Sequence, residues 1–153
     1  MSFRLLCDDF VYNGEIPEKY TCDGEDAFPE LTWTDVPKNT KSLVLIIEDP
    51  DTAFGTWDHF VLFNIPADIN LLEYNIQNLP KGARLGKNSW NRNDYGGPCP
   101  PDKEHRYYFR LFALDIILDL EEGTDKLQIK QAMQHNIIDQ TELMGRYTRK
   151  EKK

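Results

Sequence analysis

The stretch DPDTAFGTWDHF (residues 49–60) places carboxylates, a tryptophan and a histidine directly before an apolar segment. His59 stands at the entrance of that segment, where Asp49 or Asp51 could hold one ring nitrogen and leave the other to a ligand. Imidazole changes its protonation near neutral pH, so it serves both proton transfer and anion binding. Taken alone, however, His59 is better explained as a structural histidine.

His105 stands in the same kind of context and changes that interpretation. It separates the turn GGPCPPDKE (residues 96–104) from the apolar segment RYYFRLFALD (residues 106–115). Gly96 and Gly97 allow close backbone approach and would leave N–H groups free to meet an anion. Two histidines at strand entrances, each after a loop rich in proline or carboxylate, predict one shared rim that holds a ligand.

Three kinds of chemistry fit these residues. The favoured one is a non-enzymatic binding module without cofactor or metal, because the chain has no GxSxG elbow, P-loop or GxGxxG motif. In a hydrolase or isomerase, Asp49 could orient His59, His59 could act as the general base, and His105 could act as the general acid. Cys99 could act there as a nucleophile, although a cysteine in a proline-rich loop is more often incidental. A metal site could use the two histidines and one carboxylate, although no local HxxxH spacing supports it.

The composition is that of an ordinary globular protein and argues against several partners. Hydrophobic residues make up 40% and charged residues 29%, and the length of 153 residues predicts one domain over residues 1–153. A net charge of -8 argues against binding nucleic acid, which needs clustered Lys and Arg. No secretory signal and no apolar run of about 18 residues is visible. We therefore predict no transmembrane segment and a cytoplasmic location.

Neither the cysteines nor the basic tail suggests a site. Cys7, Cys22 and Cys99 are an odd number at unrelated spacings with no CxxC pair, so free thiols are expected and a zinc site is not. The tail RYTRKEKK (residues 146–153) is expected to be solvated, and frayed from about residue 148.

Short apolar and aromatic segments between proline- and glycine-rich turns predict a chain dominated by β structure and folded as an antiparallel sandwich. Strands are expected at residues 3–7, 31–34, 42–48, 60–65, 106–115 and 143–147. Pro66 ends the fourth of these, because proline cannot continue a ladder.

One helix is expected in the C-terminal third, with Thr124 as its N-cap. An apolar stripe that we interpret as packing is formed by Leu127, Ala132, Met133 and Ile137. His135 lies in this segment and is expected to be exposed and structural.

Four blocks of the sequence resemble one protein family. They are CDGEDAFPELTWTDVP (residues 22–37), DPDTAFGTWDHFVLFNIP (residues 49–66), YGGPCPPDKEHRYYFRLFALD (residues 95–115) and ELMGRY (residues 142–147). In this order they are similar to the bacterial branch of the phosphatidylethanolamine-binding proteins, also called Raf-kinase-inhibitor-like proteins. The resemblance covers nearly the whole chain, and the DPD…WxH and PP…HRY signatures together are specific.

The resemblance implies a Greek-key-like β-sandwich with one or two short peripheral helices and a small pocket for phosphate, phosphorylethanolamine or a similar anion. It implies pocket positions at Asp49, Trp57, His59, Pro100, Pro101, His105 and Tyr107, with Gly97 lining the approach. The carboxylate at Asp49 would hold a histidine, and at least one X-Pro peptide bond would be cis. Some relatives inhibit protein kinases and bacterial relatives are often dimers, so a kinase or other phosphoprotein and a second copy of the chain are further partner predictions.

Three departures from the family pattern bear on the head group. Thr52 and Ala53 replace the usual Ala-Pro pair, which makes the rim less rigid. Asp58 stands where many members have a second histidine, and it is expected to add negative charge next to the pocket. The turn before His105 reads DKE (residues 102–104) and lacks the glycine often found there.

Overall fold

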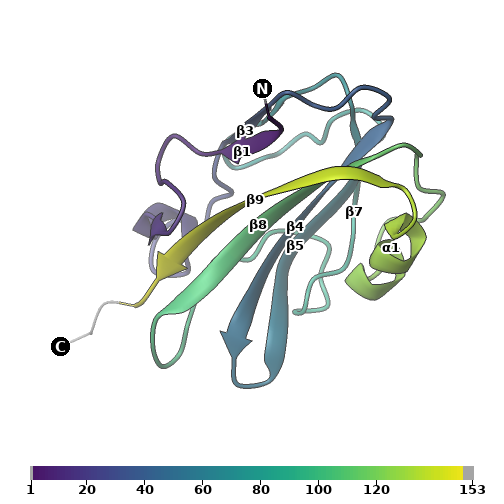
Figure 1. The fold of residues 1–153 in the computed structure, drawn as a ribbon. Coiled ribbons are helices and arrows are strands. Elements are labelled where there is room, and N and C mark those ends of the chain that lie inside the picture. Colours follow the sequence, from purple (N-terminus) through teal and green to yellow (C-terminus); the bar gives the residue numbers. More distant parts are fainter. Residues whose placement is uncertain (1, 150–153) are drawn as a thin grey trace.

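The computed structural model describes residues 2–149 and consists of two β-sheets with one short α-helix (Figure 1). The strands are β1 (Arg4–Leu6), β2 (Gly14–Glu15), β3 (Leu31–Thr34), β4 (Ser42–Thr52), β5 (Gly55–Pro66), β6 (Leu71–Leu72), β7 (Arg84–Leu85), β8 (His105–Leu114) and β9 (Ile137–Tyr147). A 3-10 turn, η1, covers Glu18–Tyr20, and the helix α1 covers Lys126–Met133. The predicted β-dominated fold with one or two short helices is confirmed.

The small sheet has the order β1-β3-β6 and the large sheet the order β2-β9-β8-β4-β5-β7. Neighbouring strands are antiparallel except β2 and β9, which are parallel. All six predicted strand segments are strands, and the prediction for residues 31–34 agrees with β3 at both ends. The C-terminal strand is much longer than predicted, because β9 starts at Ile137 and its polar residues 139–142 continue the ladder along β8 as far as Leu143.

The stretch at residues 49–60 is a hairpin rather than a loop. β4 and β5 continue through it and pair Asp49 with Trp57 and Thr52 with Gly55, so only Ala53 and Phe54 form the turn. Gly55 has a φ of 103°, which glycine adopts without strain. This hairpin carries the polar residues of the stretch beyond the apolar middle of the sheet.

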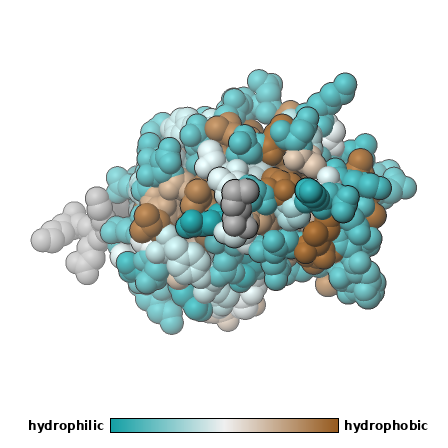
Figure 2. All heavy atoms as spheres, turned by 45° about the horizontal axis from the view of Figure 1, so that its top comes forward, coloured by the Kyte–Doolittle hydropathy of each residue, from teal (hydrophilic) through white to brown (hydrophobic). Residues whose placement is uncertain are grey.

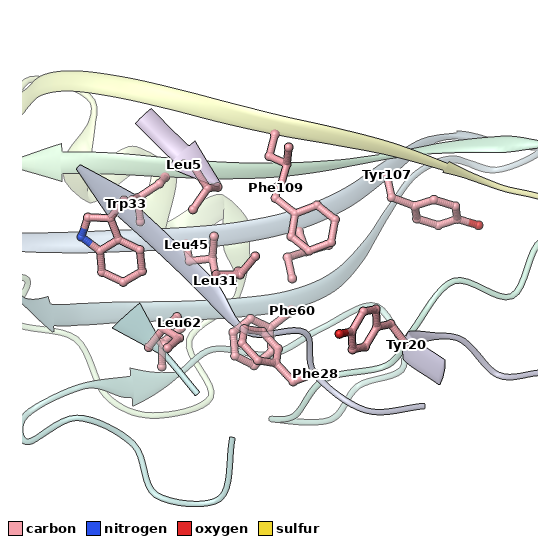
Figure 3. Packing of buried hydrophobic residues seen from close by; sticks show 14 of the residues in the cluster. Leu5, Tyr20, Phe28, Leu31, Trp33, Leu45, Phe60, Leu62, Tyr107 and Phe109 are labelled. Atoms are coloured by element: carbon pink, nitrogen blue, oxygen red, sulfur yellow. The ribbon is translucent and has the colours of Figure 1, made fainter. Parts of the chain in front are cut away.

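The central strands are apolar on both faces because each face packs against another layer. Residues such as Leu45, Phe60 and Phe109 face the small sheet and meet Leu5 and Trp33 across the sandwich (Figure 3). A second cluster on the opposite face includes Val44, Ile46, Val61, Phe63, Phe112, Leu114, Ile129 and Met133. The middle of the large sheet is thus buried on both sides, as near-continuous apolar runs predict.

Helix α1 covers the second cluster, although two details of its prediction are wrong. The N-cap is Asp125 rather than Thr124, and its side chain accepts a hydrogen bond of 2.9 Å from the Gln128 amide. The buried residues are Ile129 and Met133, whereas Leu127 is 65% exposed. Residue 137 already belongs to β9, because the helix ends four residues earlier and the chain turns back to the sheet. His135 lies in that turn and is exposed, as predicted.

The described part of the tail is held rather than frayed. Arg149 Nη2 lies 3.0 Å from Asp23 Oδ1, which joins the end of the chain to the loop after η1. Residues 150–153 of the predicted frayed tail lie outside the described residues.

Hydrophobic side chains reach the face shown in Figure 2 in several small patches set among hydrophilic ones. No helix within residues 2–149 is both long and apolar enough to cross a membrane.

Candidate functional site

The β4–β5 hairpin and the start of β8 lie at the same end of the large sheet (Figure 1). A cavity of about 330 Å³ is lined by residues of this hairpin, of β8 and of the loop before β8. Its lining contains all the predicted pocket residues except Gly97: Asp49, Trp57, His59, Pro100, Pro101, His105 and Tyr107. It also contains Thr52, Ala53, Phe54, Trp90, Cys99 and Asp102. The two predicted strand entrances therefore form one site.

Asp49 and His105 form a buried pair at the base of this cavity. Asp49 Oδ2 lies 2.6 Å from His105 Nδ1, and the side chains are 3% and 2% exposed. Asp49 Oδ1 accepts a hydrogen bond of 2.7 Å from the Asp51 amide, so both carboxylate oxygens are satisfied. Because a carboxylate oxygen accepts, Nδ1 of His105 donates, and the ring turns Nε2 away from Asp49. Asp49 thus holds a histidine, although it holds His105 rather than His59.

A β-bulge at His59 brings that side chain to the same face. The β4–β5 ladder pairs Ile47 with Phe60 and Glu48 with Asp58, which leaves His59 as an extra residue in β5. Without the bulge, His59 would point away from the face on which its neighbour Phe60 is buried. Instead His59 lines the cavity. Strict strand alternation does not predict this placement.

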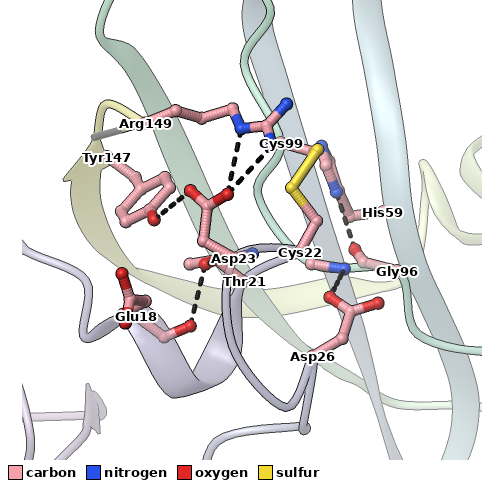
Figure 4. The surroundings of a disulfide bond; sticks show 11 residues. Glu18, Thr21, Cys22, Asp23, Asp26, His59, Gly96, Cys99, Tyr147 and Arg149 are labelled. Carbon is pink, nitrogen blue, oxygen red and sulfur yellow. Dashed lines mark hydrogen bonds and ion pairs between the residues drawn. A yellow bond between two sulfur atoms is a disulfide. The ribbon is translucent and has the colours of Figure 1, made fainter. Parts of the chain in front are cut away.

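His59 is held by backbone rather than by a carboxylate. Its Nδ1 lies 2.7 Å from the Gly96 carbonyl oxygen, and since a carbonyl only accepts, Nδ1 carries the proton (Figure 4). Burial lowers the pKa of His59 from 6.5 to about 4, while the hydrogen bond to Gly96 and the nearby Asp49 oppose this only in part. The ring is therefore neutral near pH 7, and its lone pair is on Nε2.

Aromatic rings form the walls around the two histidines. Tyr107 is edge-on to His59 at 5.3 Å between ring centroids and stacks beside His105 at 6.4 Å. Trp90 meets His59 at 5.0 Å and Trp57 at 5.5 Å, both in T-shaped contacts. The Trp57 indole Nε1 is buried and has no hydrogen-bond partner among the described residues. Buried donors are usually paired, so this unpaired N–H in a residue that lines the cavity is a candidate partner for a ligand.

The two glycines before Pro98 allow close backbone approach, as predicted, but their amides are not free. A Cβ on Gly96 would lie 2.3 Å from the Trp90 ring, and one on Gly97 would lie 2.2 Å from the Tyr20 carbonyl oxygen. The Gly96 amide donates to the His59 carbonyl at 3.1 Å, and the Gly97 amide donates to Asp26 Oδ1 at 3.0 Å. The predicted anion contact through these N–H groups is wrong, because both amides fix the loop itself.

A disulfide joins Cys22 and Cys99, so the prediction of three free thiols is wrong (Figure 4). It ties the cavity's proline-rich loop to the loop after η1, and Cys7 is the free cysteine. Cysteine spacing did not predict it because the pairing depends on the fold, which brings together residues 77 positions apart. Disulfides persist mainly in oxidising compartments, which does not favour the predicted cytoplasmic location.

Two further expectations for this region are corrected. No peptide bond between described residues is cis, so the X-Pro bonds of the cavity loop are trans. Asp58 belongs to the opposite face of the sheet, where Lys126 Nζ lies 2.6 Å from its Oδ1. Its charge is therefore compensated there and does not face the cavity.

The metal alternative required Asp49, His59 and His105 to converge on one ion. Within residues 2–149, no group of three or more His, Cys, Asp or Glu side chains is arranged to hold a metal.

Comparisons with known proteins agree with this fold and these blocks. The family model of the phosphatidylethanolamine-binding proteins matches residues 7–148. A "UPF0098 protein" of Methanothermobacter thermautotrophicus is 47% identical over 149 residues, covering 95% of this chain and 99% of the relative. One of Chlamydia pneumoniae is 44% identical, with 94% and 97% covered.

Solved structures of the same family also resemble this fold. A putative phosphatidylethanolamine-binding protein homologue from Chlamydia trachomatis superposes with a TM-score of 0.92 at 40% identity, covering 97% of this chain and 99% of that one. YbcL of E. coli, described as a new member of the mammalian family, has a TM-score of 0.91 at 27% identity, with 98% and 100% covered. The chain belongs to the phosphatidylethanolamine-binding protein family, in the branch that these bacterial and archaeal proteins represent.

Proposed function

We propose that the chain is a binding module that holds a phosphate group in the cavity between His59 and His105, either free or as a head group such as phosphorylethanolamine. The observation that carries the proposal is the buried Asp49–His105 pair, with 2.6 Å between carboxylate and ring nitrogen. It fixes the ring in one orientation with Nε2 turned away from Asp49, and in the protonated ring Nε2 is a second donor. Charge-assisted donors of this kind are strong partners for phosphate oxygens.

Three ring nitrogens of the site, on His59, His105 and Trp57, suit one protonation state of phosphate. Trp57 Nε1 is a donor, and so is His105 Nε2 when that ring is protonated, whereas Nε2 of neutral His59 is an acceptor. A phosphate monoester that carries one proton offers oxygens to the two donors and a hydroxyl to the acceptor. The singly charged form therefore matches this donor and acceptor set better than the fully ionised form.

The walls support a small ligand that is partly shielded from water. Rings of Trp57, Trp90 and Tyr107, together with two prolines, line a space of about 330 Å³. Apolar walls with a few fixed polar groups are the usual composition of small-molecule sites. Excluding water strengthens the few polar contacts that a phosphate would make there.

The test is an NMR titration of the full chain with inorganic phosphate and, separately, with phosphorylethanolamine. The ring resonances of His59 and His105 and the indole resonance of Trp57 are expected to shift and to saturate together. The exposed His135 is an internal reference in the same sample, because only nonspecific ionic effects should reach it.

The matched variants are His105→Gln and His135→Gln, both checked for an intact fold by their amide spectra. Saturable shifts are expected to disappear in the first and to persist in the second. If the site histidines respond no more than His135 at millimolar ligand, the proposal is refuted. Release of phosphate from phosphorylethanolamine in the same tube would instead favour the hydrolase alternative, with His105 as acid.

A further inference from the structure

The nitrogen that would bind the anion already contacts a carboxylate of the chain. His105 Nε2 lies 3.0 Å from Asp102 Oδ1, and the same oxygen accepts a hydrogen bond of 2.8 Å from the Lys103 amide. Two donors thus converge on a single carboxylate oxygen. This contact lies in the segment of residues 102–104, directly before β8.

Asp102 differs from the buried Asp49 on the other side of the ring. Its side chain is 60% exposed, while that of Asp49 is 3% exposed. Residues 101–104 are all exposed and lie outside the strands, so Asp102 can rotate into solvent without opening the core. Asp49 cannot leave His105 in this way. One partner of the ring is therefore fixed and the other is exchangeable.

The contact conflicts with anion binding unless Asp102 moves. An incoming phosphate oxygen would have to accept the hydrogen bond from His105 Nε2 that Asp102 now accepts. It would also be repelled by the negative charge of Asp102. The Lys103 amide and the His105 hydrogen bond lower the pKa of Asp102, so it carries this charge at neutral pH. A second anion cannot share the position, because like charges at contact distance repel.

We propose that Asp102 is an internal substitute for the ligand, which a bound phosphate must displace from His105. This inference rests on the proposed function and adds a specificity rule to it. A carboxylate ligand from solution would form the same hydrogen bond with His105 that Asp102 already forms. Asp102 has the advantage, because it is tethered to the chain next to His105. A phosphate offers additional oxygens to the remaining donors. The site therefore selects phosphate over simple carboxylates.

The test compares two variants of the same turn. Asp102→Ala removes the competing carboxylate, and Glu104→Gln removes one negative charge two residues away without touching His105. The Glu104 side chain pairs with Arg146 at 2.9 Å, so it reports only the general effect of charge. Both residues are exposed, and amide spectra check that the fold is retained.

Inorganic phosphate is expected to bind Asp102→Ala about two- to fivefold more tightly than the parent chain, as expected for loss of an exposed ion pair that competes with it. Glu104→Gln should bind phosphate with nearly unchanged affinity. In Asp102→Ala without ligand, the His105 ring resonances should shift. Added acetate should return them toward the parent positions and should leave the parent chain unaffected.

The outcomes separate this inference from the proposed function. Equal or weaker phosphate binding by Asp102→Ala, with no effect of acetate, would overturn the displacement and leave phosphate binding intact. Restoration of the His105 signals by acetate in a chain that never binds phosphate would support the internal substitute and refute the proposed ligand. An equal increase in phosphate affinity in Asp102→Ala and Glu104→Gln would mean that only the change in net charge matters. That result would also overturn the inference.

Discussion

Lowering the pH is expected to destabilise the fold through His59. The neutral ring is buried, and its pKa falls from 6.5 in the unfolded chain to about 4 in the folded one. Between these values the unfolded state binds the proton and the folded state does not, so stability is full above the unfolded pKa and falls as the pH drops toward the folded pKa. At about 1.4 kcal/mol per pKa unit, the complete loss is about 3 kcal/mol. Going from about pH 7 to about pH 5 accounts for about 2 kcal/mol of it.

The measurement is urea unfolding of the parent chain and of His59→Asn at both pH values. The asparagine amide can donate to the Gly96 carbonyl as Nδ1 does, but it cannot take up a proton. The variant is expected to lose about 2 kcal/mol less stability than the parent over this interval. Because both chains share every other titrating group, the contributions of those groups cancel in the difference.

Two results would refute the reasoning. Identical pH dependence in the two chains would mean that His59 is not held neutral by burial. A parent chain that becomes more stable relative to His59→Asn at the lower pH would mean that the folded state favours the charged ring. Either result would also remove His59 Nε2 as the acceptor for a protonated phosphate.

Three other predictions follow from the site and the cross-link. The disulfide spans 77 positions, so the double change Cys22→Ser and Cys99→Ser is expected to cost about 4 kcal/mol of stability in urea unfolding, and clearly more than Cys7→Ser, which breaks no cross-link; an unreduced chain that shows three reactive thiols in urea would contradict the bond. Trp57→Phe keeps a ring but removes the unpaired N–H, so calorimetry should show weaker phosphate binding, by about threefold to tenfold, with no loss of thermal stability. Affinity for phosphorylethanolamine is expected to peak between about pH 4 and about pH 6, above the His59 pKa of about 4 and below the second pKa of a phosphate monoester, about 6; tighter binding at about pH 8 in the same titration would contradict the match to the singly charged form.

The sequence predicted the sandwich and the meeting of the two histidines because both follow from patterns that neighbouring residues carry. Residues 42–48 and residues 111–114 are buried on both faces, and such apolar runs identify central strands. His59 and His105 come together because antiparallel neighbours of β4 place the start of β8 and the early part of β5 at the same end of the sheet.

What the sequence did not predict depends on pairing and on exact chain path. The bulge at His59 is visible only when the partners of Phe60 and Asp58 on β4 are known. The disulfide and the burial of the Gly97 amide require the loop after η1 to lie beside the proline-rich loop. These are contacts between segments far apart in the chain, and local periodicity contains no information about them.

The residues that line the cavity come partly from paired strands and partly from turns. Its central polar groups, Asp49, His59 and His105, lie on β4, β5 and β8, which are hydrogen-bonded to one another in the ladder. Phe54 and Asp102, by contrast, lie in turns that connect or precede these strands. Turn residues tolerate substitution better than paired strands do. A designer who wished to change the ligand could therefore graft new turns onto an unchanged set of strands, and natural variation within the family has the same freedom.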